Sequence, residues 1–382
     1  MTEKRKLKIG LIGLGNIGRH HIQYLSTMPD VTLVGVCDAF KEQAEKIASE
    51  QKTTAYTNHI DLLEQSGLEA VIVAVPHYAH PAICEDAFKR GIHVLCEKPL
   101  AVHVNEANHT INAYEESRKK YPGLQFGLMF QERTYPHYRK LKELLDAGEL
   151  GRLTRATWIH TDWFRTQTYY DGGDWRATWA GEGGGILTNQ CPHTLDMYQW
   201  LLGMPANIQG HAQLGKYHHI EVEDEVTAYF EHDNGMIGHL IVTTGESPGT
   251  NRLEIVGEHG KLVLENNEIT FFRNRSSMLT YLQESKEAFG RVENWRIPIE
   301  FNQKAASGHV VVTEAFVKAI LQGGGELIAQ GAEGIGSVAL ANGIMLSSFN
   351  RKMITLPLDA DEYESKLQQL IESSSYRKGV VS

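Results

Sequence analysis

The stretch LKIGLIGLGNIGRHHIQYLSTMPDVTLVGVCD, residues 7–38, decides the fold. It opens with six mostly apolar residues typical of a strand, and the turn that follows carries three glycines: Gly13, Gly15 and Gly18. A helical pattern then runs to Met28, and a second apolar run closes on Asp38. A strand, a glycine turn, a helix and a strand that ends in an acid about 20 residues further on is the context of a dinucleotide fingerprint.

Each glycine of this turn has a physical reason to be there. Gly13 permits the tight turn, Gly15 lets the backbone approach a pyrophosphate, and Gly18 allows the helix to pack closely on the strand. The helix starting near Asn16 and Ile17 would then direct its backbone N–H groups at the phosphates. Asp38 would accept hydrogen bonds from the adenosine ribose and repel a 2′-phosphate, which predicts NAD rather than NADP. Its structural alternative is to cap the helix predicted over residues 39–50.

Strands and helices continue to alternate as far as residue 130. Further strands are expected at four places, residues 53–57, 68–75, 93–97 and 125–130, with a helix between each pair. This alternation predicts an α/β domain over residues 1–130, built on a doubly wound parallel sheet. The fourth and fifth strands are both followed by proline, Pro76 and Pro99, at the edge where the nicotinamide half of a dinucleotide should lie.

The segment HVLCEKPL, residues 93–100, is the first candidate for chemistry. Its apolar run ends in Glu97, Lys98 and Pro99, and a charge pair is costly to bury at the end of a strand. Because open α/β sheets bind ligands at the carboxyl ends of their strands, Lys98 is the candidate residue for that chemistry. Its structural alternative is a surface lysine with its ammonium group in water. A cis Lys98–Pro99 bond would fit a rigid turn here.

The chain changes character after residue 130 and predicts a second, α+β domain over residues 131–382. Its expected strands are residues 153–163, 208–219, 225–232, 236–244, 252–257, 261–265 and 269–273, and its expected helices are 136–147, 310–321 and 332–350. The turn Asp233-Asn234-Gly235 favours a hairpin between two of these strands. The result is an open-faced, largely antiparallel sheet, with one face packed on helices and the other free for substrate or another subunit.

A second constellation is GGGILTNQCPHTLD, residues 183–196. Pro192 suits the first turn of a helix, which places Asn189 just before the helix and His193 within its first turn. His193 is therefore a candidate site residue, and its structural alternative is a core histidine bonded to Asp196. A polar loop rich in aromatic residues, residues 165–185, precedes this segment.

Composition excludes several classes of function. The 382 residues carry a formal net charge of -10 with no basic block, which argues against nucleic acid as a partner. No apolar segment is long enough to span a membrane, and the N-terminus resembles a first strand more than a signal peptide, so a cytoplasmic protein is expected. The four cysteines form no Cys-x-x-Cys pair, so no metal site is expected.

Taken in order, the glycine turn, Asp38, Val75-Pro76, Glu97-Lys98-Pro99 and the Gly-Gly-Gly segment leading to His193 resemble the glucose-fructose oxidoreductase/inositol dehydrogenase (Gfo/Idh/MocA) family. The resemblance covers nearly the whole chain. It implies a Rossmann domain followed by an open-faced sheet domain, and NAD(P)-dependent oxidation or reduction of a hydroxyl of a sugar or cyclitol. It further implies Lys98 as the proton-transfer residue and His193 as its partner. Asn189 departs from the aspartate, and Cys191 from the glycine, that are common in the family.

The expected sites follow from both lines of reasoning. The cofactor contacts are Gly13, Gly15, Asn16, Ile17, Gly18, Asp38, Val75, Pro76, His77, His80, Glu97 and Lys98. The catalytic residues are Lys98, His193 and Asn189. The substrate contacts are Lys98, Arg133, Trp163, Arg165, Trp175, Arg176, Asn189 and His193, and for the arginines and aromatic residues packing is the structural alternative. A homodimer or homotetramer through the open sheet face is expected.

Two other functions remain open from the sequence. One is a redox-neutral enzyme that oxidises a sugar transiently, cleaves or eliminates beside the new ketone and returns the hydride to the sugar. It predicts turnover without net NADH. The other is a non-catalytic sensor of a sugar or dinucleotide, which predicts that Lys98→Ala keeps the function.

Overall fold

The computed structural model describes residues 5–173 and 175–376, and they form two compact units. Unit 1 joins the chain up to Thr134 with two later pieces, Gly181–Gly183 and Ala306–Val338. Unit 2 holds the remainder: Tyr135–Ala180, Gly184–Ala305 and the chain from Ala339. Unit 1 thus extends slightly beyond the expected boundary at residue 130, and it also contains a segment from late in the chain. Residues 1–4, most of the basic N-terminus, lie outside the described residues.

Unit 1 is built on a parallel sheet in the order β3-β2-β1-β4-β5-β6. Its strands are β1 (Leu7–Ile12), β2 (Val31–Cys37), β3 (Thr54–Tyr56), β4 (Ala70–Val73), β5 (His93–Cys96) and β6 (Phe126–Leu128). The central strand β4 is buried at every position, as a strand covered on both faces must be. This order is the doubly wound one, so the predicted fold class is confirmed for this half.

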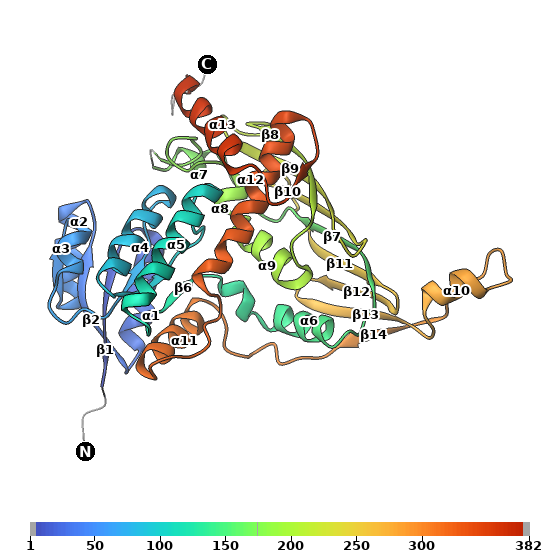
Figure 1. Ribbon diagram of the computed structural model, residues 1–382, viewed down its shortest axis with the longest axis horizontal. Helices are drawn as coiled ribbons and strands as arrows, with labels where there is room; N and C mark the ends of the chain where they lie inside the picture. The colour runs from blue at the N-terminus through green and yellow to red at the C-terminus, as the bar shows by residue number, and fades with distance from the viewer. Residues whose placement is uncertain (1–4, 174, 377–382) are drawn as a thin grey trace. The chain divides into compact units, whose positions relative to one another are not determined.

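Helices cover both faces of this sheet (Figure 1). They are α1 (Asn16–Thr27), α2 (Lys41–Gln51), α3 (His59–Leu63), α4 (His80–Lys89), α5 (Val104–Lys120) and α11 (His309–Leu321), with short 3-10 turns η1 (His77–Ala79), η2 (Gln131–Thr134) and η3 (Gly331–Glu333). Side chains of α1, α2 and α11 form one buried cluster with alternate residues of the central strands. On the other face, Phe88 of α4, Tyr114 of α5 and Phe126 of β6 pack ring against ring.

Unit 2 is built on a nine-stranded sheet in the order β14-β13-β12-β11-β7-β10-β9-β8-β15. The strands are β7 (Leu153–His160), β8 (Asn207–Leu214), β9 (Glu223–Glu231), β10 (Ile237–Thr243), β11 (Asn251–Gly257), β12 (Gly260–Glu265), β13 (Glu268–Asn274), β14 (Asn294–Ile299) and β15 (Ile354–Thr355). All pairs are antiparallel except β7 with β10. The Asp233-Asn234-Gly235 hairpin joins β9 to β10 as predicted, with Gly235 at φ +82°.

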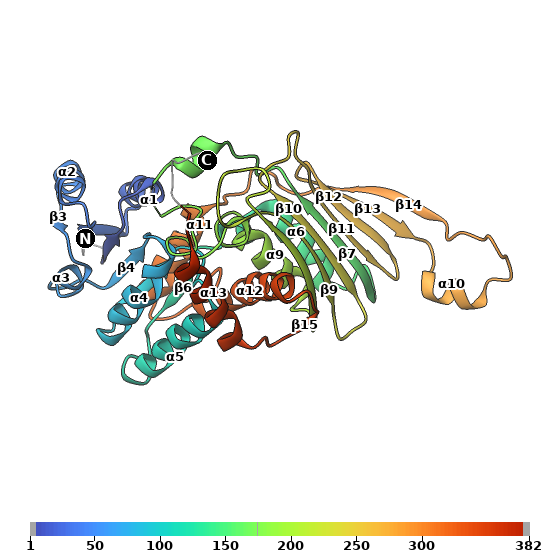
Figure 2. The ribbon, with the colours of Figure 1, turned by 90° about the horizontal axis from the view of Figure 1, so that it is seen from above.

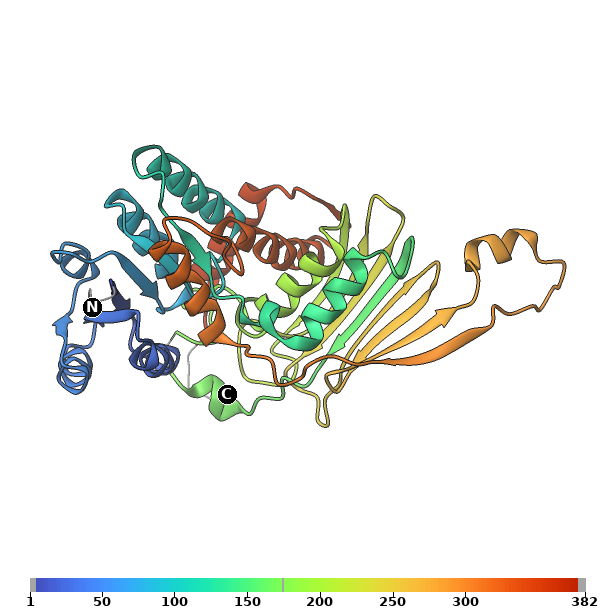
Figure 3. The ribbon, with the colours of Figure 1, turned by 90° about the horizontal axis from the view of Figure 1, so that it is seen from below.

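Helices α6 (Pro136–Asp146) and α9 (Pro192–Leu202) lie against one face of this sheet, as Figure 3 shows. The other helices of the region are α7 (Gln167–Asp171), α8 (Ile186–Asn189), α10 (Met278–Glu284), α12 (Gly334–Asn350) and α13 (Ala360–Ser373). Strand β7 buries its alternate residues Ala156, Trp158 and His160. The intervening positions of β7, β11 and β12 carry ion pairs instead: Arg155–Glu254, Arg252–Glu265 and Lys261–Glu254.

Several elements differ from the sequence expectation, among them α7, β15 and α13, which were not predicted. The edge strand β14 and helix α10 were not predicted, and both belong to an arm that extends beyond β13 (Figure 2). Pro298 lies inside β14, which is compatible with a strand only at a sheet edge. Helix α11 was expected in the second domain, but its Phe316 belongs to the buried cluster of unit 1.

Within the described residues, no helix is both long and apolar enough to cross a membrane. Over the same residues, no group of His, Cys, Asp or Glu side chains is arranged to hold a metal ion. The cysteines Cys37, Cys84, Cys96 and Cys191 are free and buried.

Candidate active site

The glycine turn between β1 and α1 is shaped so that side chains are excluded on one side and space is open on the other. A Cβ at Gly13 would lie 2.2 Å from the Ala74 carbonyl oxygen, and one at Gly18 would lie 2.1 Å from the Gly13 carbonyl oxygen. Gly13 also has φ +93°, a conformation that favours glycine. A Cβ at Gly15 would meet no atom within 4 Å. The turn therefore needs glycine at 13 and 18 for packing, and at 15 it leaves room for a ligand.

Asp38 is bound to this turn and does not cap a helix. Its Oδ2 accepts a hydrogen bond from the Leu14 N–H at 2.8 Å, and its Oδ1 accepts one from the Phe40 N–H at 2.9 Å. Helix α2 has Phe40 as its N-cap residue, so the structural alternative for Asp38 is wrong. Oδ2 also accepts a hydrogen bond from the Gln43 side-chain amide at 3.3 Å. Because Oδ1 keeps a second lone pair, Asp38 can still accept a ribose hydroxyl.

The first turn of α1 offers the other half of a dinucleotide site. Its N-cap is Gly15, which has no side chain to satisfy the free N–H groups, and the first turn carries no acid. Asn16 is exposed and Ile17 is half-buried at this helix start. Uncapped N–H groups beside an open glycine suit a pyrophosphate, so the residues present fit NAD.

His80 lies where the fourth and fifth strands end, and it is fully buried. Its Nδ1 is 2.7 Å from the Pro99 carbonyl oxygen and its Nε2 is 2.8 Å from the Val75 carbonyl oxygen. Burial holds the pKa of His80 below its usual value, and the two carbonyl contacts and the Glu97 carboxylate oppose that shift. His80 was predicted to contact the cofactor, whereas the structure gives both of its ring nitrogens backbone partners.

The neighbouring His77 is 6 % exposed, and its Nδ1 lies 3.2 Å from the Glu182 carbonyl oxygen. Val75 is half-buried and Pro76 is exposed at the same strand end. All three positions stand at the carboxyl edge of the sheet, and their contact with the cofactor stays a prediction.

Glu97 is 6 % exposed, and its Oε1 lies 2.9 Å from Nε2 of His21 on α1. Burial raises the pKa of Glu97, but the hydrogen bond from His21 and the charges of His21, His309 and Lys98 outweigh it and lower the pKa to about 2. The Glu97 carboxylate is thus engaged in a buried contact with His21, a partner that was not predicted.

Lys98 follows Glu97 directly and is half-buried. The Lys98–Pro99 peptide bond is cis, as predicted. Since β5 is a parallel strand, Lys98 stands at the same sheet edge as the glycine turn that follows β1.

Arg133 is 4 % exposed and forms an ion pair with Glu333 of η3 within unit 1. Its guanidinium group also lies 5.4 Å from the ring centre of Phe130. These contacts are consistent with the packing alternative for Arg133, and its contact with substrate stays a prediction.

In unit 2, the segment from Gly184 to His193 contains helix α8 and the first residues of helix α9. The Glu223 side chain accepts hydrogen bonds from the N–H groups of Gly185 and Leu187, at 2.9 and 3.0 Å, and so caps α8. A Cβ at Gly185 would lie 2.0 Å from the Glu223 carbonyl oxygen, which explains the glycine. Pro192 is in the first turn of α9 as predicted, and His193 behind it is 7 % exposed. Asn189 is half-buried at the end of α8.

The aromatic loop before this segment gathers around Tyr169. The guanidinium of Arg176 lies 4.4 Å from the Tyr169 ring centre and that of Arg165 lies 5.2 Å from it. The Tyr169 hydroxyl accepts hydrogen bonds from Arg176 at 2.6 Å and from Gln190 at 3.1 Å. Arg165 further stacks on Trp163, and Arg176 on Trp175. The structure brings these four predicted substrate contacts of unit 2 into one cluster.

Tyr169 and Gln190 were absent from the predicted contacts. The signal for Gln190 was its place next to Asn189, but nothing in the sequence connects it to a tyrosine about twenty residues earlier. Within the described residues, the indole N–H of Trp163 and the side-chain carbonyl of Gln190 are buried without a hydrogen-bond partner. Buried polar groups of this kind are rare unless a ligand or water satisfies them.

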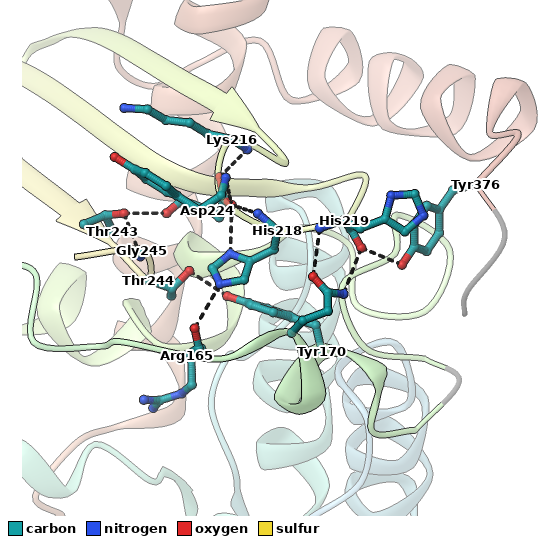
Figure 4. Close-up of polar contacts among 12 residues, drawn as sticks. Arg165, Tyr170, Lys216, His218, His219, Asp224, Thr243, Thr244, Gly245 and Tyr376 are labelled. Atoms are coloured by element: carbon teal, nitrogen blue, oxygen red, sulfur yellow. Dashed lines mark hydrogen bonds and ion pairs between the residues drawn. The ribbon is translucent and has the colours of Figure 1, made fainter. Parts of the chain in front are cut away.

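A second network holds the start of the aromatic loop in place (Figure 4). The fully buried Asp224 accepts hydrogen bonds from the N–H groups of Lys216, Tyr217 and His218 and from the His218 ring. The other ring nitrogen of His218 donates to the Arg165 carbonyl oxygen at 2.9 Å. This network was not predicted, because Asp224 and Arg165 are far apart in the sequence.

Residues 7–122 match the oxidoreductase family with an NAD-binding Rossmann fold, and residues 138–263 match the GFO/IDH/MocA C-terminal domain. The chain belongs to the Gfo/Idh/MocA family. The N-terminal unit of this Gfo/Idh/MocA protein is therefore an NAD-binding domain and the chain is an oxidoreductase, as predicted.

Several members of the Gfo/Idh/MocA family are similar over most of the chain. The scyllo-inositol 2-dehydrogenase (NAD(+)) of Bacillus subtilis (strain 168) is 25% identical over 301 residues, which are 75% of this chain and 82% of the relative. The inositol 2-dehydrogenase of Rhizobium meliloti (strain 1021) is 24% identical over 92% of this chain and 99% of the relative. The WlbA dehydrogenase of Bordetella pertussis, solved in complex with NADH and UDP-GlcNAcA, is 26% identical with a TM-score of 0.77, over 93% of this chain and 100% of that chain.

Proposed function

We propose that the protein transfers a hydride between NAD and a secondary hydroxyl or ketone of a sugar, cyclitol or sugar derivative. In this proposal Lys98 is the acid/base, His193 is its partner at the reacting hydroxyl, and Asn189 donates a hydrogen bond to the substrate. Related proteins of this family are inositol dehydrogenases and a dehydrogenase crystallised with a nucleotide-linked sugar acid, which is consistent with a polyhydroxylated substrate.

One observation carries the proposal. A half-buried lysine stands at the carboxyl end of β5, in the same parallel sheet whose β1 leads into the glycine turn. Ligands of such sheets bind at this edge, and an ammonium group that is partly withdrawn from water is suited to proton transfer. The buried carboxylate beside it is already committed to His21, which leaves Lys98 as the group for the substrate hydroxyl.

The chemistry assigns a separate task to each residue. NAD, when bound, supplies the acceptor and donor of hydride. Lys98 takes the proton of the hydroxyl oxygen during oxidation and returns it during reduction. His193 orients that oxygen or shares its proton. Asn189 cannot act as an anionic partner for an imidazolium at His193, since it is an amide.

The aromatic loop supports a polyhydroxylated ring as the substrate. Trp163 presents a buried donor and Gln190 a buried acceptor, both without a partner among the described residues, and two arginines lie in the same cluster. A sugar or cyclitol provides both hydroxyl donors and acceptors for such groups. A homodimer or homotetramer through the open sheet face stays a prediction.

The decisive experiment follows NADH absorbance with inositols, monosaccharides, glycosides and nucleotide-linked sugar acids as substrates. We expect NADH formation with one of these classes, and a loss of about 10²- to 10⁴-fold in kcat for Lys98→Met, because general acid/base catalysis contributes this much. Lys89→Met is the matched control, since Lys89 is an exposed lysine of α4 paired with Asp86. Equal rates for Lys98→Met and the native protein would remove Lys98 from this role.

The same assay separates the other functions. Product formation from a glycoside without net NADH would favour the redox-neutral enzyme over the dehydrogenase. Binding of sugar or NADH without turnover of any substrate class would favour the sensor.

A further inference from the structure

The two neighbours of Lys98 in the chain, Glu97 and Pro99, each contact a buried histidine. His21 of α1 contacts the side chain of Glu97, and His80 of α4 contacts the carbonyl oxygen of Pro99. Both histidines are 0 % exposed, and they come from different helices, His21 from α1 inside the dinucleotide fingerprint and His80 from α4 after it. Neither was singled out for such a role by the sequence.

His21 is fixed by more than its carboxylate partner. Its ring packs edge-on against Tyr24 and His309, with ring centres 6.4 and 6.0 Å away. The Nε2 of His309 lies 4.0 Å from Glu97 Oε1, so two imidazoles face one buried carboxylate. A buried carboxylate is costly without such partners, and its position is therefore strongly determined.

His80 joins the ends of two neighbouring strands. Its two ring nitrogens contact carbonyl oxygens that follow β4 and β5, those of Val75 and Pro99. A neutral imidazole donates through one nitrogen and an imidazolium through both. The ionisable groups nearest to the His80 ring are Glu97, Lys98 and His77. The backbone on the C-terminal side of Lys98 is thus tied to the strand next to it.

We propose that His21 and His80 are positioning residues for Lys98, which together we call the histidine clamp. The clamp holds the Glu97 side chain before Lys98 and the Pro99 carbonyl group after it. Because His21 belongs to α1, the clamp also connects Lys98 to the helix that begins at the glycine turn. This inference rests on the proposed acid/base role of Lys98.

The physical reason is the flexibility of lysine. Its side chain has four rotatable bonds, so the ammonium group is aimed only if the Cα it starts from is held still. Proton transfer requires placement to about 0.5 Å, and a misplacement of about 1 Å can cost about 10²-fold in rate. Two buried contacts on adjacent residues provide that rigidity without touching the substrate.

The first test measures the clamp without any substrate. Trinitrobenzenesulfonate labels lysine amines, and peptide mass spectrometry gives the rate at Lys98 relative to Lys89 in the full-length protein. We expect His21→Leu and His80→Leu to change this ratio at least fivefold, and His21→Gln, which keeps a donor for Glu97, to restore it to within twofold. His93→Gln is the control, because His93 lies at the opposite end of β5 and accepts a hydrogen bond from the Gln125 N–H.

A ratio that stays within twofold in both leucine variants would overturn the clamp. If a leucine variant fails to fold, the corresponding asparagine variant, His21→Asn or His80→Asn, replaces it. Asparagine is polar, but it is too short to contact Glu97 from position 21 or to contact both Val75 and Pro99 from position 80. Because the readout is labelling, it remains valid even if Lys98→Met leaves NADH formation intact, so failure of the clamp and failure of the proposed function are distinguishable.

The second test separates positioning from folding of the cofactor site. NADH fluorescence gives the Kd of the cofactor, and steady-state kinetics on the substrate class found above give kcat and KM. We expect kcat to fall at least tenfold in His21→Leu and His80→Leu while the Kd for NADH and the KM change less than threefold. An increase in the NADH Kd as large as the fall in kcat would instead show that the histidines only support the cofactor site, and it would overturn the proposal.

Discussion

At the residue scale, the protein itself engages both carboxylates of the candidate site: Asp38 accepts hydrogen bonds from two backbone N–H groups, and Glu97 contacts His21. Lys98 does stand at the end of a parallel strand, and its bond to Pro99 is cis, because both depend on neighbours in the chain. Glu97 was placed at the cofactor, yet its partner is His21, which lies 76 positions away. Such pairs depend on how two helices and a strand pack, and no local pattern encodes that.

Asp38 gives a prediction at this scale. Its carboxylate holds two backbone N–H groups, and we expect it also to accept the ribose hydroxyls of NAD. Asp38→Asn keeps an acceptor for the turn, so it should weaken NADH binding by about tenfold, the value of one charged hydrogen bond, and narrow the preference for NADH over NADPH. Fluorescence titration with both cofactors measures this, and an unchanged affinity ratio would show that Asp38 does not select the cofactor.

At the scale of elements, hydrophobic periodicity predicted nearly every strand but not where each one ends. A single strand was expected over residues 208–219, whereas β8 ends at Leu214. The next residues turn because the buried Asp224 carboxylate collects the N–H groups of Lys216, Tyr217 and His218. A loop organised by an acid several residues later has no signature of its own.

Because Asp224 and His218 in this loop bind each other and both can titrate, we expect the free energy of unfolding to depend on pH. Burial raises the pKa of Asp224, but the bonds from His218, Tyr217 and Lys216 outweigh it and hold the pKa below the usual value. Burial lowers the pKa of His218, but the bonds to Asp224 and to the Arg165 carbonyl outweigh it and hold that pKa above the usual value. The Asp224 contribution is therefore lost as pH falls through its lowered pKa, and the His218 contribution is lost as pH rises through its raised pKa.

Asp224→Asn should consequently reduce the free energy of unfolding by about 2 kcal/mol between about pH 4 and 6.5, with a smaller difference at either side of this window. Urea unfolding followed by tryptophan fluorescence from pH 3 to pH 9 measures the difference. Asp233→Asn, at the exposed hairpin turn, is the control. A difference that is independent of pH would contradict the ion-pair explanation.

At the scale of the whole molecule, the fold class could be predicted from the sequence, but the assignment of chain segments to the two compact units could not. The alternation of strands and helices predicted the parallel sheet, and the hairpin signal predicted part of the second one. Helix α11 follows eight of the nine strands of the second sheet, so its position in the chain favoured the second domain. Its apolar face packs on the first sheet instead, and only the three-dimensional core reveals that choice.

Phe316 tests this assignment. It is 1 % exposed in the core of unit 1, so Phe316→Ala should destabilise that unit by about 3–5 kcal/mol, the usual effect of removing a large buried side chain. Hydrogen exchange should then rise in β1, β4 and β5 and stay unchanged in β11 and β12. Faster exchange confined to unit 2 would contradict the assignment of α11 to unit 1.

The return of residues 306–338 to unit 1 also has a consequence for synthesis on the ribosome. Domains at the N-terminus usually fold first as the chain emerges. Here the fingerprint strand and the glycine turn leave the ribosome early, but the helix that covers their sheet is translated only after nearly all of the second sheet. The NAD-binding unit therefore waits, with one apolar sheet face incompletely covered, until most of its companion has been made. A nascent chain that is stalled before residue 306 should accordingly bind chaperones through that uncovered apolar face. It should gain affinity for NAD only after α11 has been translated and has left the ribosome.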